Sequence, residues 1–255
     1  MPPVSLTAVE LQRLYPRPGN TTPADLISGL DLASRAPTGR PYLVLNMVAS
    51  LDGKAAMQGR TRGLGGEADR QLFHHLRTQA DAIMVGAGTV RAERYGRAVK
   101  SDELRAKREH EGLEPDPLTV IVSGRLDLPA DIPLLQEPDA PVAIATAAEH
   151  ELTGTRARIE YLRTGDDLPL LLSRLRDDRG VRSVLCEGGP TLNSHLLAAG
   201  LVDELFLSVS PKLVGGSEAL TIVAGRTLLE PAGAELLWLL EGEGDLFSRW
   251  RIARS

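Results

Sequence analysis

The sequence predicts an α/β protein with a mostly parallel central sheet, helices on both faces and an antiparallel edge formed by the C-terminal strands. Short apolar runs alternate with amphipathic segments through most of the 255 residues, which is typical of parallel strands joined by crossover helices. The last third instead holds strand-like runs without convincing helices between them, as in an antiparallel edge. We divide the chain into an N-terminal arm, residues 1–40, and a main domain, residues 41–255.

The N-terminal arm has a helical pattern. Its first patch carries apolar residues at helix-like positions, namely Leu6, Val9, Leu11 and Leu14. A segment with proline and glycine then interrupts the pattern, and a second helix is expected near residues 24–33. We therefore expect a helical arm that packs on the main domain.

The main domain begins with a short apolar run that contains β-branched residues, as in a buried strand. The expected strands span residues 42–48, 82–85, 118–122, 142–145, 158–162, 183–186, 204–209, 234–240 and 248–253. Helices are expected at 67–79, within 91–117, around 168–175 and at 190–199. The first of these helices has apolar residues at helical spacing and acidic residues in its first turn, where the helix dipole favours them.

Composition excludes several classes of protein. The net charge is −5, and the basic residues are scattered rather than massed, so nucleic acid is not an expected partner. Cys186 is the single cysteine, which rules out an intrachain disulfide and fits a reducing cytoplasm. His74 and His75 lack the spacing of a metal pair, so we expect no metal site. We find neither a signal peptide nor a stretch of about 18 apolar residues, so no membrane segment is expected.

The junction after the strand at 183–186 is the most informative stretch. Gly188 and Gly189 let the backbone approach a ligand closely, and Pro190 suits the first position of a helix, where its missing N–H is not needed. The free N–H groups at the start of that helix favour an anion such as phosphate. A plain tight turn between strand and helix is the alternative. The full Gly-x-Gly-x-x-Gly fingerprint is absent.

A second glycine turn, residues 86–89, follows the strand at 82–85. Ligands of parallel sheets gather beyond the carboxyl ends of the strands, so two such turns favour a bound dinucleotide. Either turn alone is equally typical of an ordinary connection. Asp52 is a candidate functional carboxylate, but Asp-Gly is also a frequent turn pair. Cys186 fits a core position better than a nucleophile.

Four ordered motifs resemble the pyrimidine reductase family of riboflavin biosynthesis. They are residues 46–53, 85–90, 187–192 followed by 200–205, and 210–216. The resemblance covers about residues 41–254 and implies a three-layer, dihydrofolate reductase-like fold with NADPH as cofactor. The sequence has no His-x-Glu or Pro-Cys-x-x-Cys motif of the zinc deaminase that accompanies the reductase in bifunctional relatives. It is therefore similar to the stand-alone form.

The resemblance implies which residues contact the cofactor. NADPH contacts are expected at Ala49, Gly63, Gly86, Thr89, Glu93, Ser123, Arg125, Gly188, Gly189, Pro190, Thr191 and Leu192. Within this set, Ser123 and Arg125 are expected to bind the ribose 2′-phosphate, for which the arginine fork is suited. Such a contact would select NADPH over NADH.

The resemblance also implies substrate contacts at Thr61, Arg77 and Glu187, with Asp52 and Glu187 as the candidate catalytic residues. A cationic arginine suits a phosphorylated sugar, and a carboxylate accepts hydrogen bonds from a sugar or a pyrimidine. Many relatives have an acidic pair and a proline after the Thr-Val of the second glycine turn. This chain has Arg-Ala-Glu-Arg-Tyr at residues 91–95. The segment 94–97, expected to help hold the substrate phosphate, therefore departs from the family's pattern.

The implied activity is NADPH-dependent reduction of 5-amino-6-(5-phosphoribosylamino)uracil to the ribitylamino product. Two alternatives stay open: a dihydrofolate reductase or other pteridine-like reductase, and a non-catalytic NADP-binding protein. A homodimer is expected because relatives form dimers and because the strands at 205–209 and 236–240 would otherwise leave apolar edges uncovered.

Overall fold

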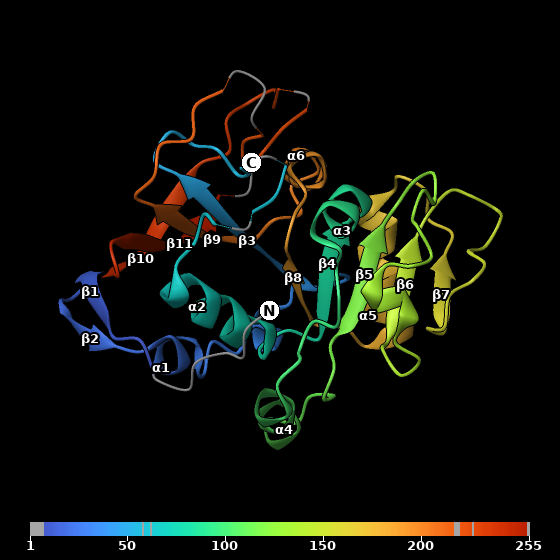
Figure 1. Cartoon of the computed structure of the whole chain (residues 1–255), viewed down its shortest axis with the longest axis horizontal. Coiled ribbons are helices and arrows are strands. Elements are labelled where there is room, and N and C mark those ends of the chain that lie inside the picture. The colour runs from blue at the N-terminus through green and yellow to red at the C-terminus, as the bar shows by residue number, and fades with distance from the viewer. Residues whose placement is uncertain (1–7, 58, 62, 217–219, 226, 254–255) are drawn as a thin grey trace.

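The computed structural model describes residues 8–253, except for 58, 62, 217–219 and 226. In this part of the chain, 11 strands form one twisted sheet in the order β2-β1-β10-β11-β9-β3-β8-β4-β5-β6-β7 (Figure 1). The order reverses around β8, because the chain passes from β3 to β4 and later returns to fill the gap between them. This reversal is the point at which α/β sheets usually bind ligands.

The parallel part of the sheet agrees with the expected α/β class. Its strands are β3 (Tyr42–Ser50), β4 (Ala82–Gly86), β5 (Leu118–Val122), β6 (Val142–Ala145), β7 (Ile159–Leu162) and β8 (Ser183–Cys186). Each pairs with its neighbours in parallel register. The apolar runs that predicted these strands are continuous because both faces of the sheet are covered.

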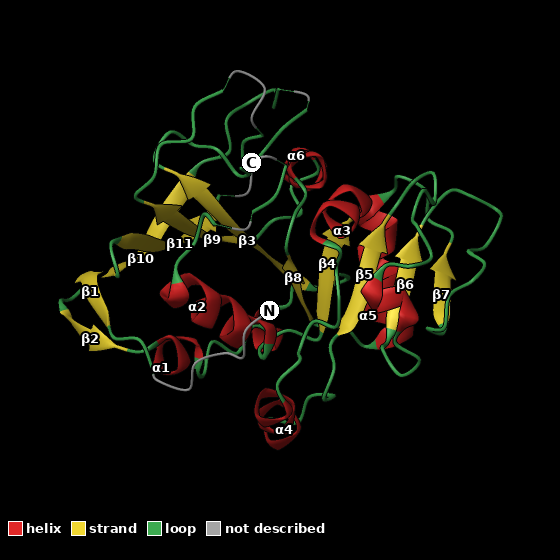
Figure 2. Ribbon diagram, in the orientation of Figure 1, coloured by secondary structure: helices red, strands yellow, loops and turns green. Residues whose placement is uncertain are grey.

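Helices cover both faces of the sheet (Figure 2). They are α1 (Pro23–Ile27), α2 (Glu67–Arg77), α3 (Ala87–Glu93), α4 (Asp102–His110), α5 (Leu168–Arg179) and α6 (Pro190–Ala198), with short 3₁₀ turns η1 (Ala33–Arg35) and η2 (Pro133–Gln136). Successive side chains of β3 point to opposite faces of the sheet. Leu43 packs with the leucines of α5, whereas Val44 packs with α2.

The boundaries of α5 follow from its sequence. The Asp167 side chain accepts a hydrogen bond of 2.8 Å from Leu170 N and so caps the first turn. Gly180 ends the helix with a left-handed backbone, φ 67°. Leu171, Leu172 and Leu175 are fully buried between these ends, and each contributes roughly 1.5–3 kcal/mol of hydrophobic stabilisation.

The C-terminal strands form the expected antiparallel part. β10 (Ala234–Gly242) pairs with β11 (Asp245–Ile252), and β11 pairs with β9 (Glu204–Ser210), in both cases antiparallel. β9 itself joins β3 in parallel. Antiparallel pairing therefore begins between β9 and β11, whereas β9 is still parallel to its other neighbour, β3.

The helical expectation for the first patch of the arm is wrong. Residues 11–15 form β1 (Leu11–Tyr15), which pairs with β10 and with β2 (Gly19–Thr21). Long-range pairing overrides the local pattern, since β10 offers an unpaired edge and the Leu11 side chain becomes fully buried against it. The second expected helix exists as the shorter α1, and Leu6 lies outside the described residues.

Two further expectations need correction. The strands at 205–209 and 236–240 are not edges, because β9 lies between β3 and β11, and β10 between β11 and β1. The edges of the described sheet are β2 and β7. The second glycine turn is also largely helical: Gly86 is the N-cap of α3, so residues 87–89 form its first turn.

The helices in the described part of the chain are short, the longest being the 12 residues of α5. None is long and apolar enough to cross a bilayer.

Candidate active site

A cleft of about 600 Å³ opens at the carboxyl ends of β4, β5 and β8. It lies at the reversal of strand order, between α3, α6 and the loops that follow β3 and β9. Most of the residues expected to bind a ligand line it, namely Thr61, Gly86, Thr89, Glu93, Ser123, Arg125, Glu187, Gly189, Pro190, Thr191 and Leu192. The fold therefore brings together residues that are spread over most of the main domain.

The two glycine turns form one cradle at the floor of this cleft. Gly86 N donates a 2.7 Å hydrogen bond to Gly188 O. A Cβ on Gly86 would lie 3.2 Å from Gly189 N, and a Cβ on Gly189 would lie 2.9 Å from Thr89 Oγ1. The Gly188–Gly189 peptide bond is cis. Glycine suits both positions, because a side chain at Gly86 would crowd the backbone of Gly189 and one at Gly189 would displace the Thr89 hydroxyl.

The helix that starts from this cradle is open to an anion. Gly189 is the N-cap of α6 in an extended conformation, Pro190 occupies its first turn, and no side chain caps the helix. The first N–H groups of a helix lack acceptors within the helix and carry partial positive charge. Because Gly189, Thr191 and Leu192 line the cleft, this charge lies at the cleft wall.

The far end of the cleft, beyond β5, is rich in charge. Ser123 is buried there, whereas Arg125 is exposed and pairs with no side chain in the described part of the chain. Arg91 donates to Asp127 O at 2.5 Å, and the Asp166 carboxylate also lines this end. Among the described residues, Arg125 is thus a cation without a side-chain partner, and Asp127 and Asp166 line the same cleft.

Glu187 is the most strongly held polar side chain of the cleft. Its Oε1 accepts a 2.7 Å hydrogen bond from Arg77 Nε, and its Oε2 accepts from Arg77 Nη2 at 2.7 Å and from the Tyr95 hydroxyl at 2.5 Å. Arg77 Nη1 donates to Ala98 O at 2.6 Å. Burial disfavours the charge of Arg77, but the Glu187 charge outweighs it and raises the pKa of Arg77, so the guanidinium stays ionised.

This network changes the expectation for Arg77. The side chain is buried, does not line the cleft, and directs its guanidinium at Glu187, Ala98 and Tyr95. It therefore lies behind Glu187, on the side away from the cleft. Tyr95 completes the network; it lies in the segment 94–97, which we expected to help hold the substrate phosphate, but its hydroxyl contacts Arg77 and Glu187.

Thr61 and Glu93 are joined to each other across the mouth of the cleft. Both Thr61 N and Thr61 Oγ1 donate to Glu93 Oε1, at 2.7 and 3.0 Å. Thr61 belongs to the loop after β3, and Glu93 is the last residue of α3. This contact ties the loop to the helix, and a ligand that used either group would have to share or replace the bond.

Asp52 lies outside the cleft lining. Its Oδ1 accepts from the Ser50 hydroxyl at 2.5 Å and from Val214 N at 3.1 Å, and its Oδ2 accepts from Gly215 N at 2.7 Å. The Ser50 hydrogen bond, followed by those two backbone N–H groups, lowers the pKa of Asp52 to about 2. The carboxylate connects the turn after β3 to the loop after β9.

Three expected cofactor residues also lie outside the lining. Ala49 is buried within β3, the carbonyl of Gly63 accepts from Lys212 Nζ at 2.7 Å, and Gly188 supports the cradle from below. The cleft instead includes several residues that we did not expect, among them Met47, Arg91, Asp127, Asp166 and Leu220. Asp166 was detectable in principle, since it follows the carboxyl end of β7.

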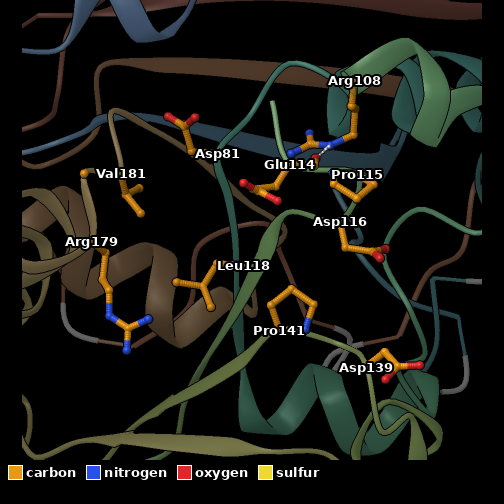
Figure 3. A pocket seen from close by; sticks show the side chains of 11 residues that line it. Asp81, Arg108, Glu114, Pro115, Asp116, Leu118, Asp139, Pro141, Arg179 and Val181 are labelled. Atoms are coloured by element: carbon orange, nitrogen blue, oxygen red, sulfur yellow. Dashed lines mark hydrogen bonds between the residues drawn. The ribbon is translucent and has the colours of Figure 1, made fainter. Parts of the chain in front are cut away.

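A second hollow of about 420 Å³ lies at the opposite, amino ends of the strands. Figure 3 shows its polar lining, which includes Asp81, Arg108, Glu114, Asp116, Asp139 and Arg179. None of the expected site residues lies in this hollow.

The described residues contain no group of three or more His, Cys, Asp or Glu side chains able to hold a metal ion. The main polar features of the cleft are therefore the glycine cradle at the start of α6 and the Glu187 carboxylate, which Arg77 and Tyr95 hold in place.

The fold and the cleft define the class: this is an α/β protein with a ligand-binding type of cleft at the reversal of strand order in its sheet. More specifically, the chain belongs to the RibD C-terminal domain family, whose model matches residues 41–240. A pyrimidine reductase-like protein from Corynebacterium diphtheriae has the same fold, with a TM-score of 0.74 and 23% identity over 92% of this chain and 100% of that one. RibD from Acinetobacter baumannii aligns with a TM-score of 0.70, 27% identity, 85% of this chain and 59% of that one.

Sequence relatives agree with the family. The chain is 36% identical to a 2,5-diamino-6-ribosylamino-4(3H)-pyrimidinone 5′-phosphate reductase from Archaeoglobus fulgidus, over 80% of this chain and 95% of the relative. A reductase of the same name from Methanothermobacter thermautotrophicus is 35% identical over 76% and 89%. Riboflavin biosynthesis protein RibD from Bacillus amyloliquefaciens is 32% identical, but only 50% of its length is covered.

Proposed function

We propose that this chain is an NADPH-dependent reductase of a ribosylamino-pyrimidine 5′-phosphate in riboflavin biosynthesis. The observation that carries the proposal is the cleft itself. Nine of the twelve residues expected to bind NADPH, and the expected substrate contacts Thr61 and Glu187, line one cavity at the reversal of strand order. A chance grouping of unrelated turns would not gather them at one end of the sheet.

The geometry fits NADPH in three places. The cradle of Gly86 and Gly189 leaves room for a pyrophosphate against backbone, and the uncapped start of α6 supplies N–H donors. Arg125, which has no described partner, suits the ribose 2′-phosphate. When bound, NADPH supplies a hydride from nicotinamide C4, and the protein supplies position and charge.

The substrate would occupy the part of the cleft near Glu187 and Thr61. Two of the most similar relatives are named for the 2,5-diamino-pyrimidinone phosphate, whereas the resemblance of the sequence motifs led to the corresponding aminouracil phosphate. Both compounds carry the ribosylamino group that is reduced at C1′, and they differ at C2 of the pyrimidine. We propose the diamino compound as the first substrate to test and the uracil as the second.

The roles of the two candidate catalytic carboxylates differ. Glu187 pairs with Arg77 and lines the cleft, so we assign it the role of accepting a hydrogen bond from the substrate. Asp52 has a pKa of about 2 and lies outside the lining. We assign it a structural role in holding the loop after β9.

The test is NADPH consumption by the purified protein with each pyrimidine phosphate and with dihydrofolate. The proposal expects oxidation with one or both pyrimidines and none with dihydrofolate. Oxidation with dihydrofolate alone would establish the pteridine alternative. Tight binding of NADPH without consumption by any substrate would favour a non-catalytic NADP-binding protein.

We also propose that the protein is a cytoplasmic homodimer. The strands at 205–209 and 236–240 do not support a dimer, because each is paired on both sides. β1 nevertheless exposes two large apolar side chains, with Leu14 at 43% and Tyr15 at 46% of their accessible surface. Sedimentation at micromolar concentration tests the dimer, and a monomer there would contradict it.

A further inference from the structure

Tyr95 occupies a buried position directly behind Glu187. It follows Arg94, whose left-handed backbone, φ 49°, ends α3, and its own N–H donates to Val90 O at 3.0 Å. The side chain is 7% exposed and does not line the cleft. Tyr95 can therefore influence a bound ligand only through the residues that it contacts.

The hydroxyl of Tyr95 joins the two members of the ion pair. It accepts from Arg77 Nη2 at 2.9 Å and donates to Glu187 Oε2 at 2.5 Å. Burial, together with the Glu187 charge, raises the pKa of Tyr95 well above its ordinary value. The phenol thus keeps its proton at every physiological pH, and its role as a donor to Glu187 is permanent.

The acceptor positions of Glu187 are nearly all in use. A carboxylate has about four lone-pair sites, two on each oxygen. Oε2 receives Arg77 Nη2 and Tyr95, and Oε1 receives Arg77 Nε. Among the described residues, nothing else donates to the side chain of Glu187, so one acceptor site is left, on Oε1.

We propose that Tyr95 is a positioning residue of the reaction, because with Arg77 it fixes the Glu187 carboxylate so that a single acceptor site on Oε1 is presented to the substrate. This inference rests on the proposed function. It implies that the substrate places an N–H or O–H donor at Oε1. A rigid single acceptor binds such a donor without first losing rotamer freedom.

Charged groups near the network do not replace the Tyr95 hydroxyl. His74 lies close enough to Arg77 and Glu187 to interact electrostatically, and Lys100 lies close enough to His74. In the described part of the chain, no hydrogen bond joins either His74 or Lys100 to the side chain of Glu187.

The test is the Tyr95→Phe variant, which removes only the hydroxyl. We expect kcat/KM for the pyrimidine phosphate to fall about tenfold, through KM more than kcat, because a hydrogen bond to a charged group is lost. The dissociation constant of NADPH should not change. Tyr161→Phe is the matched control: Tyr161 is partly buried on β7, and its hydroxyl accepts from Leu152 N at 2.8 Å, away from the cleft. It should keep wild-type kinetics.

A double-mutant cycle separates positioning from packing. In a Glu187→Gln background, Tyr95→Phe should change kcat/KM less than about twofold, since the amide cannot keep the same paired geometry. An equal loss in both backgrounds would overturn the proposal, because Tyr95 would then act independently of Glu187. Unchanged kinetics of Tyr95→Phe in the wild-type background would overturn it as well.

Crystal structures give a readout that does not depend on activity. In Tyr95→Phe the Glu187 carboxylate should turn away from its wild-type orientation, and an unchanged orientation would contradict the proposal. If the wild-type protein reduced neither pyrimidine phosphate, the proposed function would fail. The structures would still decide whether Tyr95 holds Glu187, so the two failures are distinguishable.

Discussion

Gly86 N donates to Gly188 O at 2.7 Å, which joins the two glycine motifs of the sequence into one cradle. The motifs follow different strands, β4 and β8, that are adjacent in the sheet. Neighbouring parallel strands end at the same edge, so their following turns meet. The central feature of the candidate site is thus a direct product of strand order.

The cradle predicts the effect of Gly189→Ala. The new Cβ would lie 2.9 Å from Thr89 Oγ1 and would occupy space at the start of α6. We expect NADPH affinity to fall at least about tenfold, because backbone contact with the phosphates is blocked. Fluorescence titration of NADPH measures it. Gly19→Ala, whose Cβ has open space in β2, is the control, and equal affinities of the two variants would refute the cradle.

The buried ion pair predicts a large effect on stability. Arg77→Met leaves the Glu187 charge without its partner in a site where the carboxylate is only 5% exposed. The free energy of unfolding should fall by about 3–5 kcal/mol, as measured by urea denaturation. Arg251→Ala removes an exposed pair with Glu235 and should lower it by less than about 1 kcal/mol. Similar losses in both variants would show that burial does not strengthen the first pair.

Arg125 predicts the cofactor preference. Arg125→Ala should weaken NADPH binding about tenfold or more and leave NADH binding nearly unchanged, because only NADPH carries the 2′-phosphate. Steady-state KM values for the two cofactors measure this. Arg174→Ala, at an exposed position on α5, controls for loss of a positive charge. A parallel loss for both cofactors would place the 2′-phosphate elsewhere.

His74 predicts a component of acid sensitivity. Burial, and next the positive charge of Arg77, lower its pKa from 6.5 to about 4. Between pH 6.5 and about 4, His74 therefore binds a proton in the unfolded chain but not in the folded protein. The contribution of neutral His74 to the free energy of unfolding is complete above pH 6.5 and is lost as the pH drops towards 4. Between neutral pH and about pH 4, the free energy of unfolding of wild type should fall by about 2 kcal/mol more than that of His74→Gln.

Urea denaturation at several pH values measures this difference. His110→Gln, exposed at the end of α4, should follow the wild-type curve. If the free energy of unfolding of His74→Gln had the same pH dependence as that of wild type, burial of neutral His74 would not contribute to the acid sensitivity.

Local sequence signals were sufficient for most of the central sheet. The apolar run of β4 and the glycines behind it lie within a few residues of one another, and so do β8 and Gly188, so strand, turn and helix could be predicted together. The ends of parallel strands then fixed where the cleft should be. Gly189, Ser123 and Glu187 line it for this reason.

Contacts between distant residues could not be predicted in the same way. Gln12 pairs with Glu241 in the sheet, and no local pattern of the arm indicates that partner. Arg77 and Glu187 are separated by 110 residues, so their pairing, and the shift of Arg77 from the cleft to its support, required the folded structure. Tyr95 lay within the segment expected to help hold the substrate phosphate, but its contacts with Arg77 and Glu187 could not be predicted from the sequence.

The most direct test of the central claim is transfer of deuterium from NADPH labelled at nicotinamide C4. The two pyrimidine phosphates would be incubated with the purified protein and the labelled cofactor, and the products examined by mass spectrometry and NMR. The account predicts one deuterium at C1′ of an opened, ribityl product. Recovery of both pyrimidines without deuterium, under conditions in which the labelled cofactor binds, would contradict it.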